Sequence, residues 1–165
     1  MDPRSPRRDA DPSEAEGDPN EELGHWLRSY RDHHPRGPAL DKTLAERYVR
    51  LPDGRRRADR VIWAGLGRRP DPKVDHPTII VEFVSRTRRD RTRDYEEKRR
   101  EYLALGIAEY WVIDRFRRTM TVSRNQPDAM AELVIAEGET YRTDLLPGFD
   151  LPLARLLAVA DEWRK

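Results

Sequence analysis

Residues 78–111 of the chain read TIIVEFVSRTRRDRTRDYEEKRREYLALGIAEYW, and this stretch decides the fold. It opens with an apolar run broken only by Glu82, which is typical of a central strand covered on both faces. A carboxylate there needs a cation, hydrogen bonds or a proton, because burying it alone is costly. Lys98 follows in a helical segment, where its spacing from Tyr95 and Tyr102 places all three on one side. We therefore expect a carboxylate and an ammonium where core residues belong.

The length of 165 residues predicts one domain, and the composition excludes several kinds of site. The 32 basic and 31 acidic residues leave a net charge of +1, so the overall balance does not indicate a partner. The lack of cysteine excludes a disulfide framework, a thiol nucleophile and a thiolate zinc site. Neither a signal peptide nor a membrane-spanning apolar run is evident, so we expect a cytoplasmic protein without membrane contact.

The order of the elements predicts an α/β fold with helices packed on a mixed sheet. Residues 1–20 are rich in proline and charge and predict a disordered tail, which leaves 21–165 as a single domain. Periodicity and turn signals predict helices at 21–34, about 90–105 and 151–163, and strands at 43–51, 57–64, 78–84, 107–114, 118–124, 131–136 and near 141.

Asp59 is the second acid of interest, and it shares a strand face with Val61 and Trp63. If its strand neighbours that of Glu82, the two carboxylates converge at one end of the sheet. Two such hard oxygen ligands can hold Mg²⁺ or Mn²⁺, with water and phosphate at the remaining positions. The alternative is that Asp59 is an exposed acid at a strand end and that Glu82 pairs with an arginine.

Lys98 has three interpretations. Its ammonium can stabilise negative charge on a phosphate or an attacking water beside the metal. It can instead lay its stem on the sheet and keep its head in water. The third interpretation is a buried ion pair between Lys98 and Glu82 that serves structure alone. Arg99 lies on the same helical stripe and is an alternative to Lys98 in the first role.

A cluster of arginines occupies the link that precedes this helix and the start of the helix itself. Such a basic rim can bind phosphates by charge and by bidentate hydrogen bonds. Alternatively, it is a solvated loop, because 28 of the 32 basic residues are arginine and a high-GC genome explains such a bias. The candidates for phosphate contacts are Arg86, Arg88, Arg89 and Arg91.

Three segments of the chain resemble the Uma-two family of restriction-endonuclease-like proteins, within the PD-(D/E)XK nuclease superfamily. They are YVRLPDGRRRADRVIW, TIIVEFVSRTRRDR and EKRREYLALGIAEYWVIDR, of which the last is the most specific. The resemblance covers roughly residues 25–150. It implies a restriction-endonuclease-like αβββαβ core with a strand-rich C-terminal extension, and a metal-dependent endonuclease that hydrolyses phosphodiester bonds of DNA.

By this resemblance, Asp59 and Glu82 are the metal ligands and Lys98 is the catalytic lysine, supplied by the helix. Tyr102 and Arg99 are supporting candidates. The chain departs from the simple E-X-K pattern, because Val84 stands where the strand lysine would be. The rival interpretation is a catalytically inactive nuclease-fold module that binds nucleic acid or a partner protein. A double-strand cut by so small an enzyme would most simply need two copies, so a homodimer is also expected.

Overall fold

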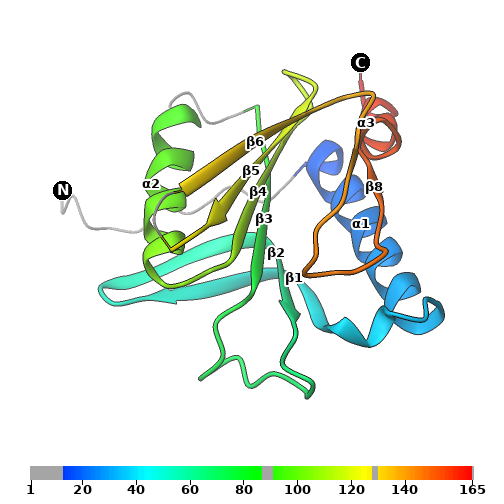
Figure 1. The fold of residues 1–165 in the computed structure, drawn as a ribbon. Coiled ribbons are helices and arrows are strands. Elements are labelled where there is room, and N and C mark those ends of the chain that lie inside the picture. Colours follow the sequence, from blue (N-terminus) through cyan, green and yellow to red (C-terminus); the bar gives the residue numbers. More distant parts are fainter. Residues whose placement is uncertain (1–12, 87–90, 128–129, 165) are drawn as a thin grey trace.

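The computed structural model describes residues 13–86, 91–127 and 130–164. Its centre is a six-stranded mixed sheet with the strand order β1-β2-β3-β4-β5-β6 (Figure 1). Only β3 and β4 pair in parallel, and a helix connects them. The strands are β1 Leu40–Leu51, β2 Gly54–Ala64, β3 Ile79–Phe83, β4 Glu109–Asp114, β5 Thr119–Asn125 and β6 Met130–Ala136.

Helices cover both faces of this sheet. One cluster of buried apolar side chains joins α1 (Glu14–His33) and α3 (Leu153–Asp161) to one face of the sheet. A second cluster joins α2 (Arg91–Ala104) to the other face. A short 3-10 helix (Gly37–Ala39) leads into β1, and β7 (Thr140–Tyr141) pairs with β8 (Leu151–Pro152) in a small second sheet. β3 is therefore a central strand with both faces covered, as its apolar sequence predicts.

The observed order of elements confirms the predicted αβββαβ core and its strand-rich extension. The turn at Pro52 and Asp53 joins β1 to β2, where Gly54 has a positive φ of 155°. Gly106, with a φ of 88°, follows the end of α2 as a left-handed residue. None of the helices among the described residues combines the length and the apolar character needed to cross a membrane.

The first helix begins earlier than predicted, at Glu14, so residues 14–20 of the predicted tail are helical. This part of α1 is held by polar contacts, which a search for apolar periodicity does not find. Glu16 is buried and pairs with Arg115 at 3.0 Å, and Asn20 is also buried. The rest of the predicted tail, residues 1–12, lies outside the described residues.

The alternation of side chains along β2 is interrupted at Asp59, so the side chains before and after it change faces. Residues four apart in a regular strand share a face. Here, however, Arg56 pairs with carboxylates of α2, whereas Arg60 hydrogen-bonds to α1 on the opposite side of the sheet. Glu46 of β1, which the register places opposite Asp59, has a positive φ of 51°. This change of face releases Asp59 from the regular β1–β2 pairing and lets its side chain reach the neighbouring strand β3.

Candidate active site

Asp59 and Glu82 lie side by side at one end of the β2–β3 pair. The two strands are antiparallel neighbours whose last paired residues are Arg60 and Val81. Continuing that register by one step places Asp59 opposite Glu82. The Asp59 carboxylate accepts a hydrogen bond of 2.7 Å from the backbone N–H of Phe83, the residue after Glu82. The structure therefore confirms that the two strands are neighbours and brings the two acids together.

Lys98 turns inward from α2 onto Glu82. Its Nζ donates a hydrogen bond of 3.1 Å to Glu82 Oε1, and the two side chains are only 2% and 4% exposed. The interpretation with the ammonium head in water is therefore wrong. Two charges removed from water are costly to bury even when they pair, so the arrangement is either a functional site or a structural ion pair.

Tyr102 lies beside both acids and belongs to α2, the helix that also carries Lys98. It is completely buried, and its hydroxyl has no hydrogen-bond partner within the described part of the chain. Burial raises the pKa of this phenol well above its usual value, and the negative charges of Glu82, Glu101 and Asp59 add to the rise in pKa. Its ring packs edge-on against Tyr110 at 5.2 Å. The hydroxyl is thus a hydrogen-bonding group held close to two carboxylates.

The backbone of Asp59 is fixed from the opposite face of the sheet. Asn20 of α1 donates a hydrogen bond of 2.8 Å to the Asp59 carbonyl, and Arg60 donates to the Asn20 side-chain oxygen at 2.7 Å and to its carbonyl at 3.0 Å. Arg60 also donates to Thr43 at 3.0 Å. Burial lowers the pKa of Arg60 to about 10, so its guanidinium stays charged at neutral pH. α1 packs closely here, because a Cβ at Gly24 would lie 2.5 Å from the Arg60 guanidinium.

Sequence reasoning missed Asn20 and Arg60. Asn20 falls within the predicted tail, and Arg60 has no partner nearby in the sequence that would suggest a role. Their side chains lie 40 residues apart in the chain, and no local pattern connects them. A cationic residue in an otherwise apolar stretch of β2 was the one available signal.

The remaining candidates are not drawn together in the same way. Arg99 pairs with Glu132 of β6 rather than with Glu82. Arg86 is exposed beyond the end of β3. The predictions for Arg88 and Arg89 lie outside the described residues, as does the side chain of Arg91.

The donor chemistry at Asp59 and Glu82 fits a divalent cation of the Mg²⁺ type. Mg²⁺ uses one or two protein carboxylates and keeps several waters or phosphate oxygens. In the described ranges there is no group of three or more acidic, histidine or cysteine side chains arranged to hold a metal. The pair of carboxylates therefore suits an ion that shares its coordination with water and substrate, rather than a fully enclosed structural metal.

Comparisons with known proteins show the family and the fold that the chain is similar to. A family model described as "Putative restriction endonuclease", Uma2, matches residues 10–154. The fold is similar to the crystal structure of "a putative nuclease belonging to DUF820" from Anabaena variabilis ATCC 29413. That likeness has a TM-score of 0.70 and 12% identity, over 90% of this chain and 83% of the other. At this identity it shows a shared fold.

A second solved structure in the comparison is a DrdV–DNA complex determined by cryo-electron microscopy. The match has 14% identity and covers 90% of this chain but only 14% of that one. Its TM-score of 0.35 is too low to support an argument about the fold or its ligand. The comparison with curated proteins found no match.

Proposed function

The chain belongs to the Uma2 family of putative restriction endonucleases, and from this membership we propose that it is a metal-dependent endonuclease that hydrolyses DNA phosphodiester bonds. The observation that carries the proposal is the buried pair of Glu82 and Lys98 beside Asp59, at an end of the β2–β3 pair. Two carboxylates and one ammonium give this trio one excess negative charge. A divalent cation offsets that charge, whereas a purely structural pair would not need the second acid.

Asp59 and Glu82 would hold the ion, which is Mg²⁺ or Mn²⁺ in this proposal. When bound, such an ion supplies Lewis acidity and lowers the pKa of its water. The chain contributes the orientation of the two carboxylates. Asp59 is fixed through its side chain by the Phe83 N–H and through its carbonyl by Asn20. Glu82 is fixed by Lys98, so neither acid needs to reorganise on binding.

Lys98 would stabilise the negative charge that develops on the phosphate in the transition state. Its ammonium is held 3.1 Å from Glu82 Oε1 with almost no exposure to solvent. Electrostatic stabilisation is strongest where water is excluded and the charge is already in place. The lysine thus takes the role that the strand position of Val84 would serve in a simple E-X-K pattern.

Tyr102 is the supporting residue in this proposal. Its buried hydroxyl lies near both acids without a partner in the described part of the chain. It can donate to a carboxylate or to a water at the site. Arg99 is a weaker candidate, because its guanidinium pairs with Glu132 on β6.

Nicking of supercoiled plasmid DNA in Mg²⁺ or Mn²⁺ tests the proposal. Glu82→Gln and Lys98→Met keep the size of each side chain and should both lose nicking. Glu96→Gln makes the same chemical change at an exposed position of α2 and is the matched control. Equal nicking by the wild type and Glu82→Gln, purified side by side, would refute the proposal.

A nuclease-fold module that binds without turnover is the second candidate. The direct contact between Lys98 and Glu82 favours it, because such a pair can serve structure alone. Calorimetric titration with Mn²⁺ separates the two functions. The enzyme should give a heat of binding that disappears in Asp59→Asn, whereas an inert module should give none in either protein.

A further inference from the structure

The outer part of the β1–β2 hairpin exposes Tyr48, Arg50 and Arg55 to solvent on one face. It projects from the sheet beside α2 in Figure 1. One face packs toward α2, where Val49 is buried and Arg56 pairs with Glu97 and Glu101. The register pairs Tyr48 with Arg57 and Arg50 with Arg55, so these four share the other face. We call these four residues, together with the adjoining Lys73, the hairpin surface.

Two arginines of the hairpin surface are placed against each other. Arg50 and Arg55 are direct cross-strand partners, and like charges in that position destabilise a sheet. Arg50 donates to the carbonyl of Lys73, and Arg55 lies over the ring of Tyr48 at 4.0 Å. Neither arginine has a carboxylate partner within the described ranges, although Arg56 and Arg57 beside them do. An arginine-rich composition does not explain this contrast, whereas an external anion would relieve the repulsion.

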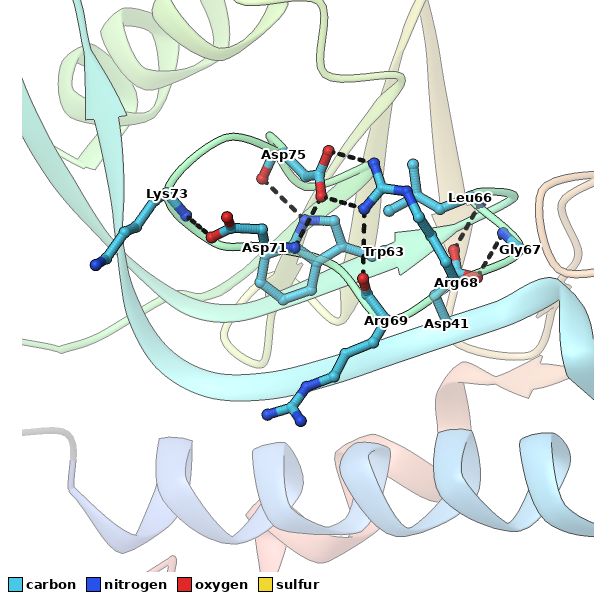
Figure 2. A network of polar contacts seen from close by, with 9 residues as sticks. All are labelled: Asp41, Trp63, Leu66, Gly67, Arg68, Arg69, Asp71, Lys73 and Asp75. Atoms are coloured by element: carbon cyan, nitrogen blue, oxygen red, sulfur yellow. Dashed lines mark hydrogen bonds and ion pairs between the residues drawn. The ribbon is translucent and has the colours of Figure 1, made fainter.

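The loop that carries Lys73 is held rigid by a polar network (Figure 2). Arg68 forms two hydrogen bonds with the Asp75 carboxylate, at 2.7 and 2.8 Å, and Trp63 donates to the Asp75 carbonyl at 3.0 Å. The bond from Arg68 lowers the pKa of Asp75 to about 2, so this pair stays charged at neutral pH. In Figure 2 the side chain of Lys73 points away from the network. The loop thus places a further cation next to Arg50.

The hairpin surface and the candidate active site share strand β2, which carries Arg55, Arg57 and Asp59. Every second residue of a strand points to the same side, so positions 55, 57 and 59 form one row. The change of face at Asp59 turns this row from solvent toward α2. Four residues of extended strand separate Arg55 from Asp59, about 13 Å. This is about four base-pair steps of a duplex at 3.4 Å each.

We propose that the hairpin surface binds the phosphate backbone of duplex DNA next to the cleavage site, an inference that rests on the proposed nuclease function. Guanidinium groups bind phosphate oxygens through paired charged hydrogen bonds. Contacts of this kind set affinity and register and carry no base sequence. The hairpin surface therefore holds DNA on the enzyme, and any sequence preference comes from elsewhere.

Fluorescence anisotropy with a 20-base-pair duplex in EDTA tests the inference, because binding is then measured without cleavage. The full chain and Arg50→Gln/Arg55→Gln are titrated over a salt series. The variant should bind more weakly, and its slope of log affinity against log salt should fall by about two, since each phosphate contact contributes about one. Arg50→Lys/Arg55→Lys keeps both charges and should keep the slope, which excludes a folding defect.

The matched control is Arg142→Gln/Arg155→Gln, which removes the same charge from two exposed positions in the C-terminal part of the chain. It should leave affinity and slope unchanged. An equal loss in the control, or wild-type binding by Arg50→Gln/Arg55→Gln, would overturn the inference. If that variant binds normally while Glu82→Gln alone abolishes nicking, only the hairpin surface is refuted. If the wild type binds through the hairpin yet never nicks, only the nuclease function is refuted.

Discussion

Glu82 and Glu109 are buried glutamates on adjacent parallel strands, and they differ in the groups that surround their carboxylates. Each is 3% exposed. Glu109 begins β4 and Glu82 lies near the end of β3, so they occupy opposite ends of the same pair of strands. Burial of an acid alone therefore does not identify a functional site in this sheet, and the kind of partner must decide.

The Glu109 carboxylate is surrounded by fixed donors. Its Oε1 accepts hydrogen bonds from Trp111 at 3.0 Å and Tyr141 at 2.6 Å, and its Oε2 accepts one from Thr143 at 2.7 Å. Arg124 adds a charge at 3.6 Å. Both oxygens are satisfied and one cation balances one anion. This arrangement clamps the C-terminal segment to the sheet and leaves no role for a metal ion.

The Glu82 carboxylate is also paired with one cation, but it has a second acid beside it. Lys98 contacts it directly, and the Asp59 carboxylate accepts a hydrogen bond from the backbone N–H of the next residue, Phe83. Two acids placed beside one lysine are typical of sites that bind ions or reacting groups. The contrast leads to four predictions, taken from the largest expected effect to the smallest.

The largest difference should appear in activity. Glu82→Gln should lower the nicking rate by about 10³-fold or more, as expected when an electrostatic contribution to the transition state is removed. Glu109→Gln should leave the rate per folded molecule unchanged. The measurement is single-turnover nicking, normalised by the folded fraction from circular dichroism. Comparable losses in the two variants would show that both acids act through structure.

The free energy of unfolding should depend more on Glu109 than on Glu82, the reverse of the order expected for activity. Glu109→Ala removes the shared acceptor of several buried donors and should cost about 3–5 kcal/mol of the free energy of unfolding. Urea denaturation measures this cost. A loss below about 1 kcal/mol, the range of an ordinary surface substitution, would contradict the structural role of Glu109.

A double-variant cycle tests whether Glu82 and Lys98 serve more than each other. Their coupling in unfolding experiments should be about 1–3 kcal/mol, because each single change leaves a buried charge behind. Glu82→Gln/Lys98→Met should therefore recover part of the stability but none of the nicking. Recovery of both would identify the pair as structural.

Two buried tyrosines provide the smallest test. Tyr141 donates to Glu109 and accepts from Arg124, so Tyr141→Phe should cost about 2 kcal/mol. Tyr102→Phe should change the free energy of unfolding by less than about 0.5 kcal/mol, because its hydroxyl has no partner in the described part of the chain to lose. It should nevertheless lower nicking. Urea denaturation and plasmid nicking of both variants check the prediction, which fails if Tyr102→Phe nicks at the wild-type rate.

The sequence predicted the parts of the site that depend on local pattern. The continuous apolar run of residues 78–84 identified Glu82 as an exception in a buried strand, and helical spacing placed Lys98 on the packed side of α2. Both placements are confirmed by the structure. The prediction that Asp59 and Glu82 converge required their two strands to be neighbours. The antiparallel register of β2 and β3 confirms that they are.

The parts that the sequence did not predict depend on contacts between distant segments. Asn20 and Arg60 are 40 residues apart, and Glu109 and Tyr141 are 32 apart. Polar side chains of this kind carry no periodic signal, because their partners are chosen by the tertiary fold. The early start of α1 escaped for the same reason, since Glu16 is buried against Arg115 rather than in an apolar stripe.

Anomalous diffraction from crystals soaked in Mn²⁺ tests the central claim most directly. The account predicts a peak about 2.1 Å from a carboxylate oxygen of Asp59 and from one of Glu82, the distance typical of small divalent cations. The peak should vanish in Asp59→Asn. A fully soaked crystal with no peak between these two acids, and Lys98 still bonded to Glu82, would contradict the assignment of this pair as a metal-dependent site.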